Sequence, residues 1–204
     1  MNTHETRWGI LSTGRIAHDF VTALRYAPGA RVAAVSSRSV ESAQSFIDEN
    51  KLTGAVAYGS PEELAGSELV DIIYVASPHS HHYQHMKTCL EHGKNVLCEK
   101  AFTLTAAQTR EVIELARAKG VFLMEAMWTR YLPAIRALVE THLPRIGDVT
   151  MVQADFGFVD PGVQRLSDPH LGGGALLDIG VYSLTFPALA YGGMCDGCTD
   201  RRRR

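Results

Sequence analysis

The segment Val70–Ala76 constrains the fold of this chain more than any other. It reads Val-Asp-Ile-Ile-Tyr-Val-Ala, a short and nearly continuous run of apolar and β-branched residues. Such a run is typical of a central parallel strand that helices cover on both faces. Five shorter apolar runs predict its neighbours in the sheet: Trp8–Leu11, Val32–Val35, Val56–Tyr58, Asn95–Cys98 and Val121–Met124.

Stretches with the spacing of amphipathic helices alternate with these strands. The expected helices are Arg15–Tyr26, one capped by Ser39, one opened by Pro61, His82–His92, and Thr105–Lys119 closed by Gly120. Alternation of strands and helices with short connections is typical of an open, doubly wound parallel sheet. The sequence therefore predicts an α/β domain over residues 1–125.

The pattern changes after residue 125. It predicts a helix over Arg130–His142, a strand over Val149–Phe156, a polar loop over Asp160–Leu171 and a helix over Ala175–Tyr191. A single strand needs partner strands to be stable, and none follows. We therefore expect residues 126–191 to be the start of an incomplete, truncated α+β second domain. Residues 192–204 follow no pattern and are expected to be an aberrant tail.

Composition narrows the class of protein. The chain has 204 residues, of which 46% are hydrophobic and 21% charged, as in soluble globular proteins. The net charge of −2 offers no basic excess for nucleic acid, and the Arg201–Arg204 run is too short to change that. No uninterrupted apolar run is long enough to span a membrane, and Met1–Arg7 lacks the apolar core of a secretory signal. We expect a cytoplasmic protein with no membrane or nucleic-acid partner.

Cysteine and histidine spacing gives little support to a metal site. Cys89 and Cys98 lie in apolar runs and are expected to be reduced core thiols. Cys195 and Cys198 form a C-x-x-C pair without the second pair of a zinc ribbon. Several histidines cluster between residues 79 and 85, where positions 81 and 85 are one helical turn apart, but no third ligand stands nearby. We expect no metal.

The first predicted strand runs into the segment Ser12-Thr13-Gly14-Arg15-Ile16-Ala17 and then into a helix. This segment approximates the dinucleotide fingerprint G-x-G-x-x-G/A, with Gly14 as the second glycine and Ala17 as the small residue for helix packing. Ser12 replaces the first glycine. The helix N-terminus would supply N–H groups and a positive dipole end for phosphates. The alternative is an ordinary strand-to-helix turn.

The second predicted strand ends in Ser36-Ser37-Arg38. A protein specific for NAD would place an acidic residue there, on the ribose hydroxyls. A hydroxyl followed by a guanidinium instead suits a 2′-phosphate, because Ser37 can donate a hydrogen bond and Arg38 can pair with the phosphate. We therefore expect NADP, with NAD less favoured. The alternative is that Arg38 is only a solvated residue at a helix start.

Three further segments resemble one known family. They are Ala76-Ser77-Pro78-His79-Ser80-His81-His82, Cys98-Glu99-Lys100, and Gly172-Gly173-Gly174-Ala175-Leu176-Leu177-Asp178-Ile179-Gly180-Val181-Tyr182. In this order they resemble the glucose–fructose oxidoreductase, inositol dehydrogenase and MocA (Gfo/Idh/MocA) family. Ser12 and the run Glu125–Arg130 look like its branch of dimeric dihydrodiol dehydrogenases and NADP-dependent D-xylose 1-dehydrogenases. The resemblance covers residues 7 to 191 and implies a Rossmann-type first domain.

The resemblance implies roles for residues outside the phosphate loop. Lys100 matches the family lysine that contacts substrate and cofactor, and its ammonium would stabilise a developing alkoxide. Tyr182 stands where many members have a histidine base, and Asp178 lies one helical turn before it. The remaining residues implied to lie near the cofactor are Ser77, His79, His82, Glu99, Trp128 and Arg130. Where the family usually has proline after the lysine, this chain has Ala101.

These roles imply an NADP-dependent oxidoreductase that transfers a hydride between nicotinamide and a carbinol of a sugar or trans-dihydrodiol. Full-length relatives are expected to be homodimers, whereas this chain is expected not to form the dimer. Alternatives remain for each residue: Tyr182 as a core side chain, Asp178 as a structural charge and Trp128 as a packing residue. For the whole chain, the alternative is a truncated, non-catalytic nucleotide-binding remnant.

Overall fold

The computed structural model describes residues 5–159 and 162–192. The described chain forms two compact units. The first runs up to Ala126 and includes His170–Gly172, and the second comprises Met127–Pro169 and the residues from Gly173 onward. We describe each unit by itself.

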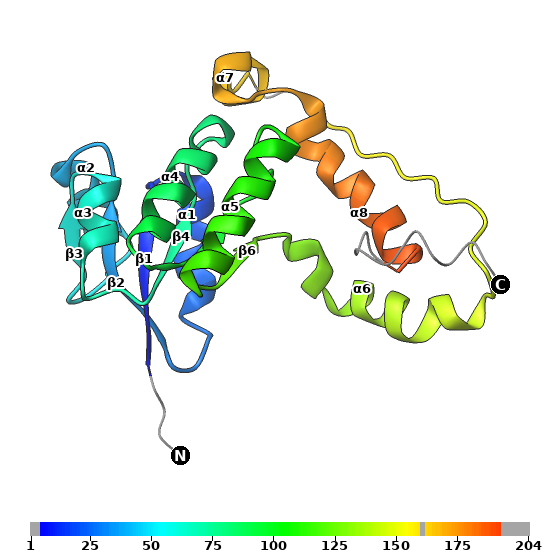
Figure 1. The fold of residues 1–204 in the computed structure, drawn as a ribbon, viewed down its shortest axis with the longest axis horizontal. Helices are drawn as coiled ribbons and strands as arrows, with labels where there is room; N and C mark the ends of the chain where they lie inside the picture. Colours follow the sequence, from blue (N-terminus) through cyan, green and yellow to red (C-terminus); the bar gives the residue numbers. More distant parts are fainter. Residues whose placement is uncertain (1–4, 160–161, 193–204) are drawn as a thin grey trace. The chain divides into compact units, whose positions relative to one another are not determined.

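A six-stranded parallel sheet forms the centre of the first unit (Figure 1). Its strands are β1 (Thr6–Leu11), β2 (Ala30–Ser36), β3 (Val56–Tyr58), β4 (Ile72–Val75), β5 (Asn95–Cys98) and β6 (Leu123–Glu125). Their order across the sheet is β3-β2-β1-β4-β5-β6, and every pair is parallel. The predicted α/β class and all six predicted strands are confirmed, with ends shifted by up to two residues.

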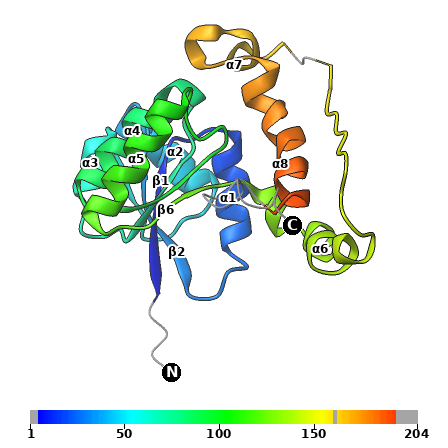
Figure 2. The same ribbon diagram turned by 45° about the vertical axis from the view of Figure 1, so that its right-hand side comes forward.

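Helices cover both faces of this sheet, as Figure 2 shows. They are α1 (Arg15–Leu24), α2 (Val40–Glu49), α3 (Pro61–Gly66), α4 (His79–Glu91) and α5 (Ala106–Lys119). Two hydrophobic cores result. One packs α1 and α2 on the sheet around Ile10 and Phe46, and the other packs α3, α4 and α5 around Ile73 and Met86. Cys89 and Cys98 are free and buried in the second core, as predicted.

Local capping signals explain where these helices begin and end. The side chains of Ser39 and Thr105 accept hydrogen bonds from backbone N–H groups of the first turns of α2 and α5. Gly120 ends α5 with a φ of 66°, a conformation that favours glycine. The predicted start of α4 is wrong by three residues. Because Pro78 fixes its own φ near −59°, the helix starts directly after it, at His79.

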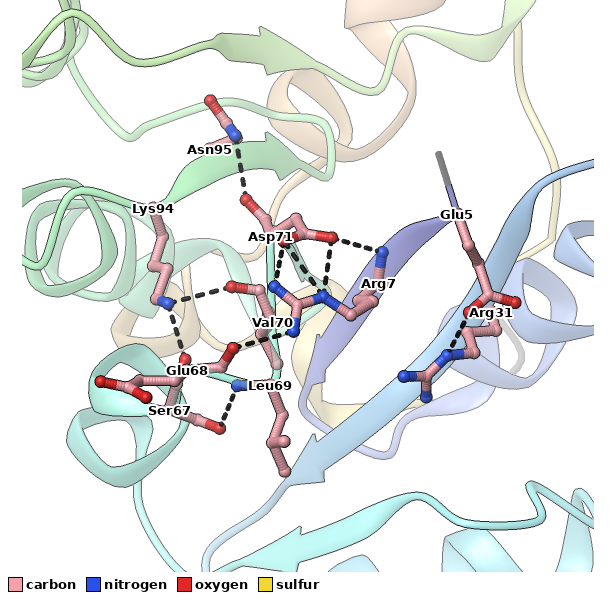
Figure 3. Close-up of polar contacts among 10 residues, drawn as sticks. All are labelled: Glu5, Arg7, Arg31, Ser67, Glu68, Leu69, Val70, Asp71, Lys94 and Asn95. Atoms are coloured by element: carbon pink, nitrogen blue, oxygen red, sulfur yellow. Dashed lines mark hydrogen bonds and ion pairs between the residues drawn. The ribbon is translucent and has the colours of Figure 1, made fainter. Parts of the chain in front are cut away.

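A polar network joins strands at the amino end of the sheet (Figure 3). The guanidinium of Arg7 on β1 donates to both carboxylate oxygens of Asp71, just before β4, and to the Glu68 carbonyl. The ammonium of Lys94 donates to two carbonyl oxygens, those of Ser67 and Val70. Burial, and then the charge of Arg7, lowers the pKa of Lys94. This network ties β1, β4 and β5 together at the edge opposite their carboxyl ends.

The second unit differs from its prediction in several places. The predicted helix over Arg130–His142 is interrupted at Leu132. A 3-10 turn (Trp128–Tyr131) precedes this residue, and a continuous helical run follows it, made of α6 (Pro133–Ala137), a π turn (Leu138–His142) and a 3-10 turn (Leu143–Arg145). Pro133 explains the interruption, because it lacks the N–H that would continue the preceding turn. The predicted strand over Val149–Phe156 is wrong. That segment has no secondary structure, since the described part of this unit holds no strand to pair with it.

The predicted loop over Asp160–Leu171 contains short helical turns, α7 (Gln164–Ser167) and a 3-10 turn at Pro169–Leu171. The helix predicted from Ala175 is present as a π turn (Leu176–Gly180) followed by α8 (Val181–Ala190). By length and composition, the helical run Pro169–Ala190 could cross a membrane, which the sequence prediction did not anticipate; core helices of soluble proteins pass the same test. The predicted aberrant tail, with Cys195, Cys198 and the arginine run, lies outside the described residues apart from its first position.

Candidate cofactor site and active-site residues

A cavity of about 580 Å³ opens in the first unit at the carboxyl ends of β1, β2 and β4. The strand order reverses at this point, because β1 lies between β2 and β4. The helices that follow β1 and β4, α1 and α4, pack on opposite faces of the sheet. Ligands of doubly wound sheets bind at such a switch point. The cavity is lined by Leu11, Ser12, Thr13, Gly14, Ser36, Ser37, Arg38, Gly59, Pro61, Ser77, Pro78, His81, His85 and Leu171.

The predicted phosphate loop forms one wall of this cavity. Ser12 has a φ of 88°, a conformation that favours glycine, which explains why the fingerprint begins with glycine at this position. Gly14 is the N-cap of α1, and a Cβ added to it would meet no atom within 4 Å. The start of α1, with Arg15 and Ile16 exposed in its first turn, therefore faces open space. First-turn N–H groups lack intrahelical partners, so this geometry suits a pyrophosphate.

Ser37 and Arg38 lie beside the phosphate loop. The hydroxyls of Thr13 and Ser37 are 3.2 Å apart and hydrogen-bonded, which links the loop after β1 to the end of β2. Arg38 is exposed and lines the same cavity. None of the described residues that line the cavity is acidic. The electrostatic environment at the end of β2 therefore favours an anionic group over a neutral ribose diol.

Ser77 and two histidines of α4, His81 and His85, also line the cavity. His85 Nδ1 lies 2.9 Å from the Ser77 hydroxyl, and burial lowers the pKa of His85 to about 4. His82 is fully buried, with its ring nitrogens 2.7 Å from the Ser77 carbonyl oxygen and 2.8 Å from that of Ala101. Burial lowers the pKa of His82 to about 4, although the two carbonyl oxygens raise it. Neutral His82 carries one ring N–H and so donates to one of these two carbonyl oxygens, and it does not line the cavity.

His79 contacts a segment from much later in the chain. Its Nδ1 lies 3.1 Å from the carbonyl oxygen of Gly172, which belongs to the same unit. A Cβ on Gly172 would come within 2.8 Å of the His79 Cβ and 2.7 Å of the Leu104 side chain, and the Gly172 φ is 73°. Only glycine fits this approach. The first glycine of the Gly172–Gly174 run thus fastens residues 170–172 to the amino end of α4.

Glu99 and Lys100 follow β5 at the carboxyl edge of the sheet. The Glu99 carboxylate is buried and accepts a 2.6 Å hydrogen bond from the hydroxyl of Tyr74, a fully buried residue of β4. Burial raises the pKa of Glu99, while the hydrogen bonds from Tyr74 and from the Lys100 backbone lower it. Glu99 therefore anchors the carboxyl end of β5. Lys100 follows directly and is only partly buried. The peptide bond between Lys100 and Ala101 is cis.

In the second unit, Tyr182 on α8 lies among aromatic side chains. The indole Nε1 of Trp128 donates a 2.9 Å hydrogen bond to the Tyr182 hydroxyl. The two rings are nearly perpendicular, with centroids 6.0 Å apart, and Phe156 contacts Tyr182 in a similar edge-on arrangement at 5.7 Å. Trp128 and Tyr182, predicted from separate segments, are thus brought together. Arg130 is exposed in the same 3-10 turn as Trp128.

Asp178 is buried and forms an ion pair with Arg165 of α7, at 3.2 Å. The glycine run makes this pair possible. A Cβ on Gly173 would come within 2.8 Å of the Asp168 backbone, so only glycine allows the chain to pack directly against α7. The N–H groups of Gly173 and Gly174 donate to the carbonyl oxygens of Asp168 and Leu166.

The structure thus divides the predicted site residues between the units. The phosphate loop, Ser37, Arg38, Ser77, His79, His82, Glu99 and Lys100 belong to the first, and Trp128, Arg130, Asp178 and Tyr182 to the second. Sequence reasoning missed Arg165, because an ion pair between segments gives no local signal. It noted His81 and His85 only as an unlikely metal pair, whereas both line the cavity. The described residues contain no group of three or more metal-ligating side chains.

Comparison with known proteins agrees with this geometry. Residues 6–127 match the family described as "Oxidoreductase family, NAD-binding Rossmann fold" (GFO_IDH_MocA). The chain is 45% identical over 193 residues to trans-1,2-dihydrobenzene-1,2-diol dehydrogenase of Xenopus laevis, covering 92% of this chain and 57% of that protein. It is 44% identical over 210 residues to D-xylose 1-dehydrogenase (NADP(+)) of Hypocrea jecorina, covering 91% of this chain and 53% of that protein. The chain spans little more than half the length of these relatives.

A solved structure extends the likeness to the fold. KijD10, a 3-ketoreductase from Actinomadura kijaniata in complex with TDP-benzene and NADP, superposes with a TM-score of 0.77 at 28% identity. The match covers 91% of this chain and 56% of that one. Solved variants of the same ketoreductase include one with a lysine replaced by alanine and one with a tyrosine replaced by phenylalanine. With its nucleotide loop at the switch point of a six-stranded Rossmann sheet, the chain belongs to the Gfo/Idh/MocA oxidoreductase family.

Proposed function

We propose that the chain is the nucleotide-binding and proton-transferring part of an NADP-dependent dehydrogenase that acts on a carbinol of a sugar or cyclic diol. The observation that carries this proposal is the cavity at the switch point, which combines a helix N-terminus, the open face of Gly14 and Arg38 with no carboxylate in its lining. An oxidoreductase family and an NADP-dependent relative support the same conclusion.

The residues present fit an NADP molecule. The loop Ser12–Gly14 and the first turn of α1 would hold the pyrophosphate, because a Cβ on Gly14 would meet no atom and the first N–H groups of a helix lack partners four residues earlier. Ser37 and Arg38 would hold the 2′-phosphate through charge-assisted hydrogen bonds. When bound, the nicotinamide accepts or supplies the hydride. The neutral His85 beside Ser77 adds no charge to this wall of the cavity.

The chain's own groups would manage the proton. In the oxidative direction the carbinol oxygen loses its proton while its carbon loses a hydride, so negative charge develops on oxygen. We propose that the Lys100 ammonium stabilises that charge and that Tyr182 accepts the proton. The anchoring of the Lys100 strand end by the buried Glu99–Tyr74 hydrogen bond supports a fixed position for the lysine. We propose that Asp178, held by Arg165, orients this end of the helical run.

The surroundings of Tyr182 support a substrate with a flat carbon face. Trp128 and Phe156 present aromatic rings beside the Tyr182 ring, and such rings stack on the C–H faces of sugars and cyclic diols. The relatives named for D-xylose and for trans-1,2-dihydrobenzene-1,2-diol act on ring carbinols of this kind. The buried free thiols Cys89 and Cys98 support a reducing, cytosolic location as part of this proposal.

The cofactor part of the proposal is tested by binding. Titration with NADPH and NADH, followed by quenching of tryptophan fluorescence, should show tighter binding of NADPH. Arg38→Ala should weaken NADPH binding by about 1.5–3 kcal/mol, the scale of a hydrogen bond to a charged group, and leave NADH binding little changed. Arg31→Ala is the matched control, because Arg31 lies near the other end of β2 and pairs with Glu5. Equal affinity for both nucleotides would reject the choice of NADP.

The catalytic part is tested by Lys100→Met. This variant should bind NADPH within about twofold of the parent, since the lysine side chain makes no essential phosphate contact in the proposal, yet NADP-dependent oxidation of D-xylose should be lost. Near-parental turnover would reject the role of Lys100. A parent chain that binds NADPH but turns over neither D-xylose nor a dihydrodiol would favour the alternative of a non-catalytic nucleotide-binding protein.

A further inference from the structure

The hydrogen bond between Trp128 and Tyr182 has a fixed direction. An indole Nε1 carries a proton and has no lone pair to offer, so it can only donate. The Tyr182 oxygen is therefore the acceptor across this 2.9 Å contact. A phenol oxygen is a far better acceptor when it carries negative charge, because charge-assisted hydrogen bonds are about twice as strong as neutral ones.

The backbone around Trp128 holds the indole in place. Its neighbours in sequence, Met127 and Thr129, are 5% and 7% exposed, whereas Trp128 itself is 53% exposed. The segment is thus anchored on both sides of a side chain that projects outward. The rings of Phe156 and Tyr182 meet in a T-shaped arrangement with centroids 5.7 Å apart, so the phenol ring has two aromatic neighbours. An exposed tryptophan that served only as packing would not need its N–H aimed at a hydroxyl.

We propose that Trp128 is a positioning residue that orients Tyr182 and stabilises its deprotonated form through the indole N–H. This inference rests on the proposed function of Tyr182 as the proton acceptor. In that step the O–H bond of the carbinol breaks, a new O–H bond forms on the Tyr182 oxygen, and the carbinol hydride leaves for the nicotinamide. The indole bond is strongest before the transfer and weakens as the phenolate is neutralised, so it favours the reactive state of the base.

The contact itself can be tested without any turnover. The chain contains two tryptophans, so its proton–nitrogen NMR spectrum should show two indole cross-peaks, and Trp128→Phe identifies one of them. Tyr182→Phe should shift the Trp128 cross-peak and accelerate exchange of its indole proton with water by about 2- to 12-fold, the range that corresponds to a net hydrogen bond. The cross-peak of Trp8, which is packed against Phe20 in the first unit, is the internal control and should not move.

The effect on the base is tested by a pH profile of kcat/KM for carbinol oxidation. Trp128→Phe keeps a ring but removes the donor, so the rising limb of the profile should move to higher pH by about 0.3–1 unit, and alkaline pH should restore most of the rate. Trp128→His returns a ring N–H and should recover part of the shift. A purely structural role would lower the rate equally at every pH.

The outcomes separate the two proposals. If Tyr182→Phe leaves the Trp128 cross-peak and its exchange rate unchanged, the positioning role is overturned whether or not the protein is active. The Trp128 cross-peak could respond to Tyr182→Phe while Trp128→Phe lowers kcat/KM by the same factor at every pH. In that case the hydrogen bond exists but the positioning role is overturned. If the cross-peak responds and no substrate is oxidised, the proposed function fails while the hydrogen bond to Tyr182 is supported.

Discussion

At the scale of single residues, His82 shows how burial sets a charge state. The ring is fully buried between two carbonyl oxygens, and burial lowers its pKa to about 4 from an ordinary value near 6.5. The unfolded chain therefore takes up a proton below about pH 6.5, which the folded chain does not take up until about pH 4. Since the unfolded state binds more protons in this window, stability falls as the pH drops from about 6.5 to 4.

We predict that His82→Gln removes part of this dependence. Glutamine can still donate to one carbonyl oxygen but does not titrate, so the variant should be less stable at pH 7 and should lose less stability on acidification. One such histidine contributes a slope of at most about 1.4 kcal/mol per pH unit. Urea unfolding at pH 7, 6 and 5 measures it. The control is His92→Gln, which changes an exposed histidine of the same unit. Parallel curves for His82→Gln and the parent would contradict the prediction.

At the scale of secondary-structure elements, the two ends of the sheet carry different groups: a polar network at one end and the cavity at the other. The amino end holds the Arg7–Asp71 network, which joins β1 to the start of β4 (Figure 3). The carboxyl ends hold the cavity and the Glu99–Lys100 pair. Because strands of a parallel sheet run in one direction, each strand separates these two edges by its whole length. Stability and nucleotide binding should therefore respond to different substitutions.

We predict that Asp71→Asn lowers the melting temperature by about 4 °C, because the Arg7 guanidinium loses a charged partner that it contacts through both carboxylate oxygens. NADPH affinity should stay within about twofold of the parent, a bound set by the distance of Asp71 from the cavity. Thermal unfolding measures the melting temperature, and fluorescence titration with NADPH measures the affinity. Glu5→Gln, which breaks an exposed ion pair on the neighbouring strand, is the control and should change the melting temperature little. A large loss of affinity in Asp71→Asn would show that the two edges are coupled.

At the scale of the whole molecule, the hydrophobic cores are unevenly distributed. Both clusters of buried apolar residues lie in the first unit. In the described part of the second unit, several large apolar side chains are instead exposed, among them Met151 at 77% and Val159 at 91%. Apolar burial is the main source of folding free energy, so the two units should differ in local stability.

Hydrogen exchange followed by mass spectrometry should therefore separate the units. We predict the strongest protection in β1, β4 and β5, because each has a neighbouring strand on both sides and ends in three buried residues. Peptides covering residues 149–159 should exchange within seconds, as expected for backbone without secondary structure. NADPH should increase protection around the loop after β1 and leave residues 149–159 unchanged. Strong protection of residues 149–159 in the free protein would contradict this account.

Local patterns were enough to predict the first unit. Strand and helix periodicity, the N-caps Ser39 and Thr105, and the left-handed Gly120 are properties of neighbouring residues, so they could be identified without a structure. The phosphate loop belongs to the same class, because a strand, a Gly14 turn and a helix are contiguous. The error at the start of α4 and the interruption at Leu132 both lie directly beside a proline, which overrides the periodicity of the apolar residues.

Tertiary structure decided the contacts that join distant segments. Three contacts show this. Gly172 contacts His79 across 93 positions of the sequence, Arg165 pairs with Asp178 across 13, and Trp128 donates to Tyr182 across 54. None leaves a periodic signal, because each depends on how the chain turns between its ends. The predicted strand at Val149–Phe156 failed for the same reason. Its composition suits a strand, but a strand exists only when a second one supplies the hydrogen bonds, and that is a property of the fold.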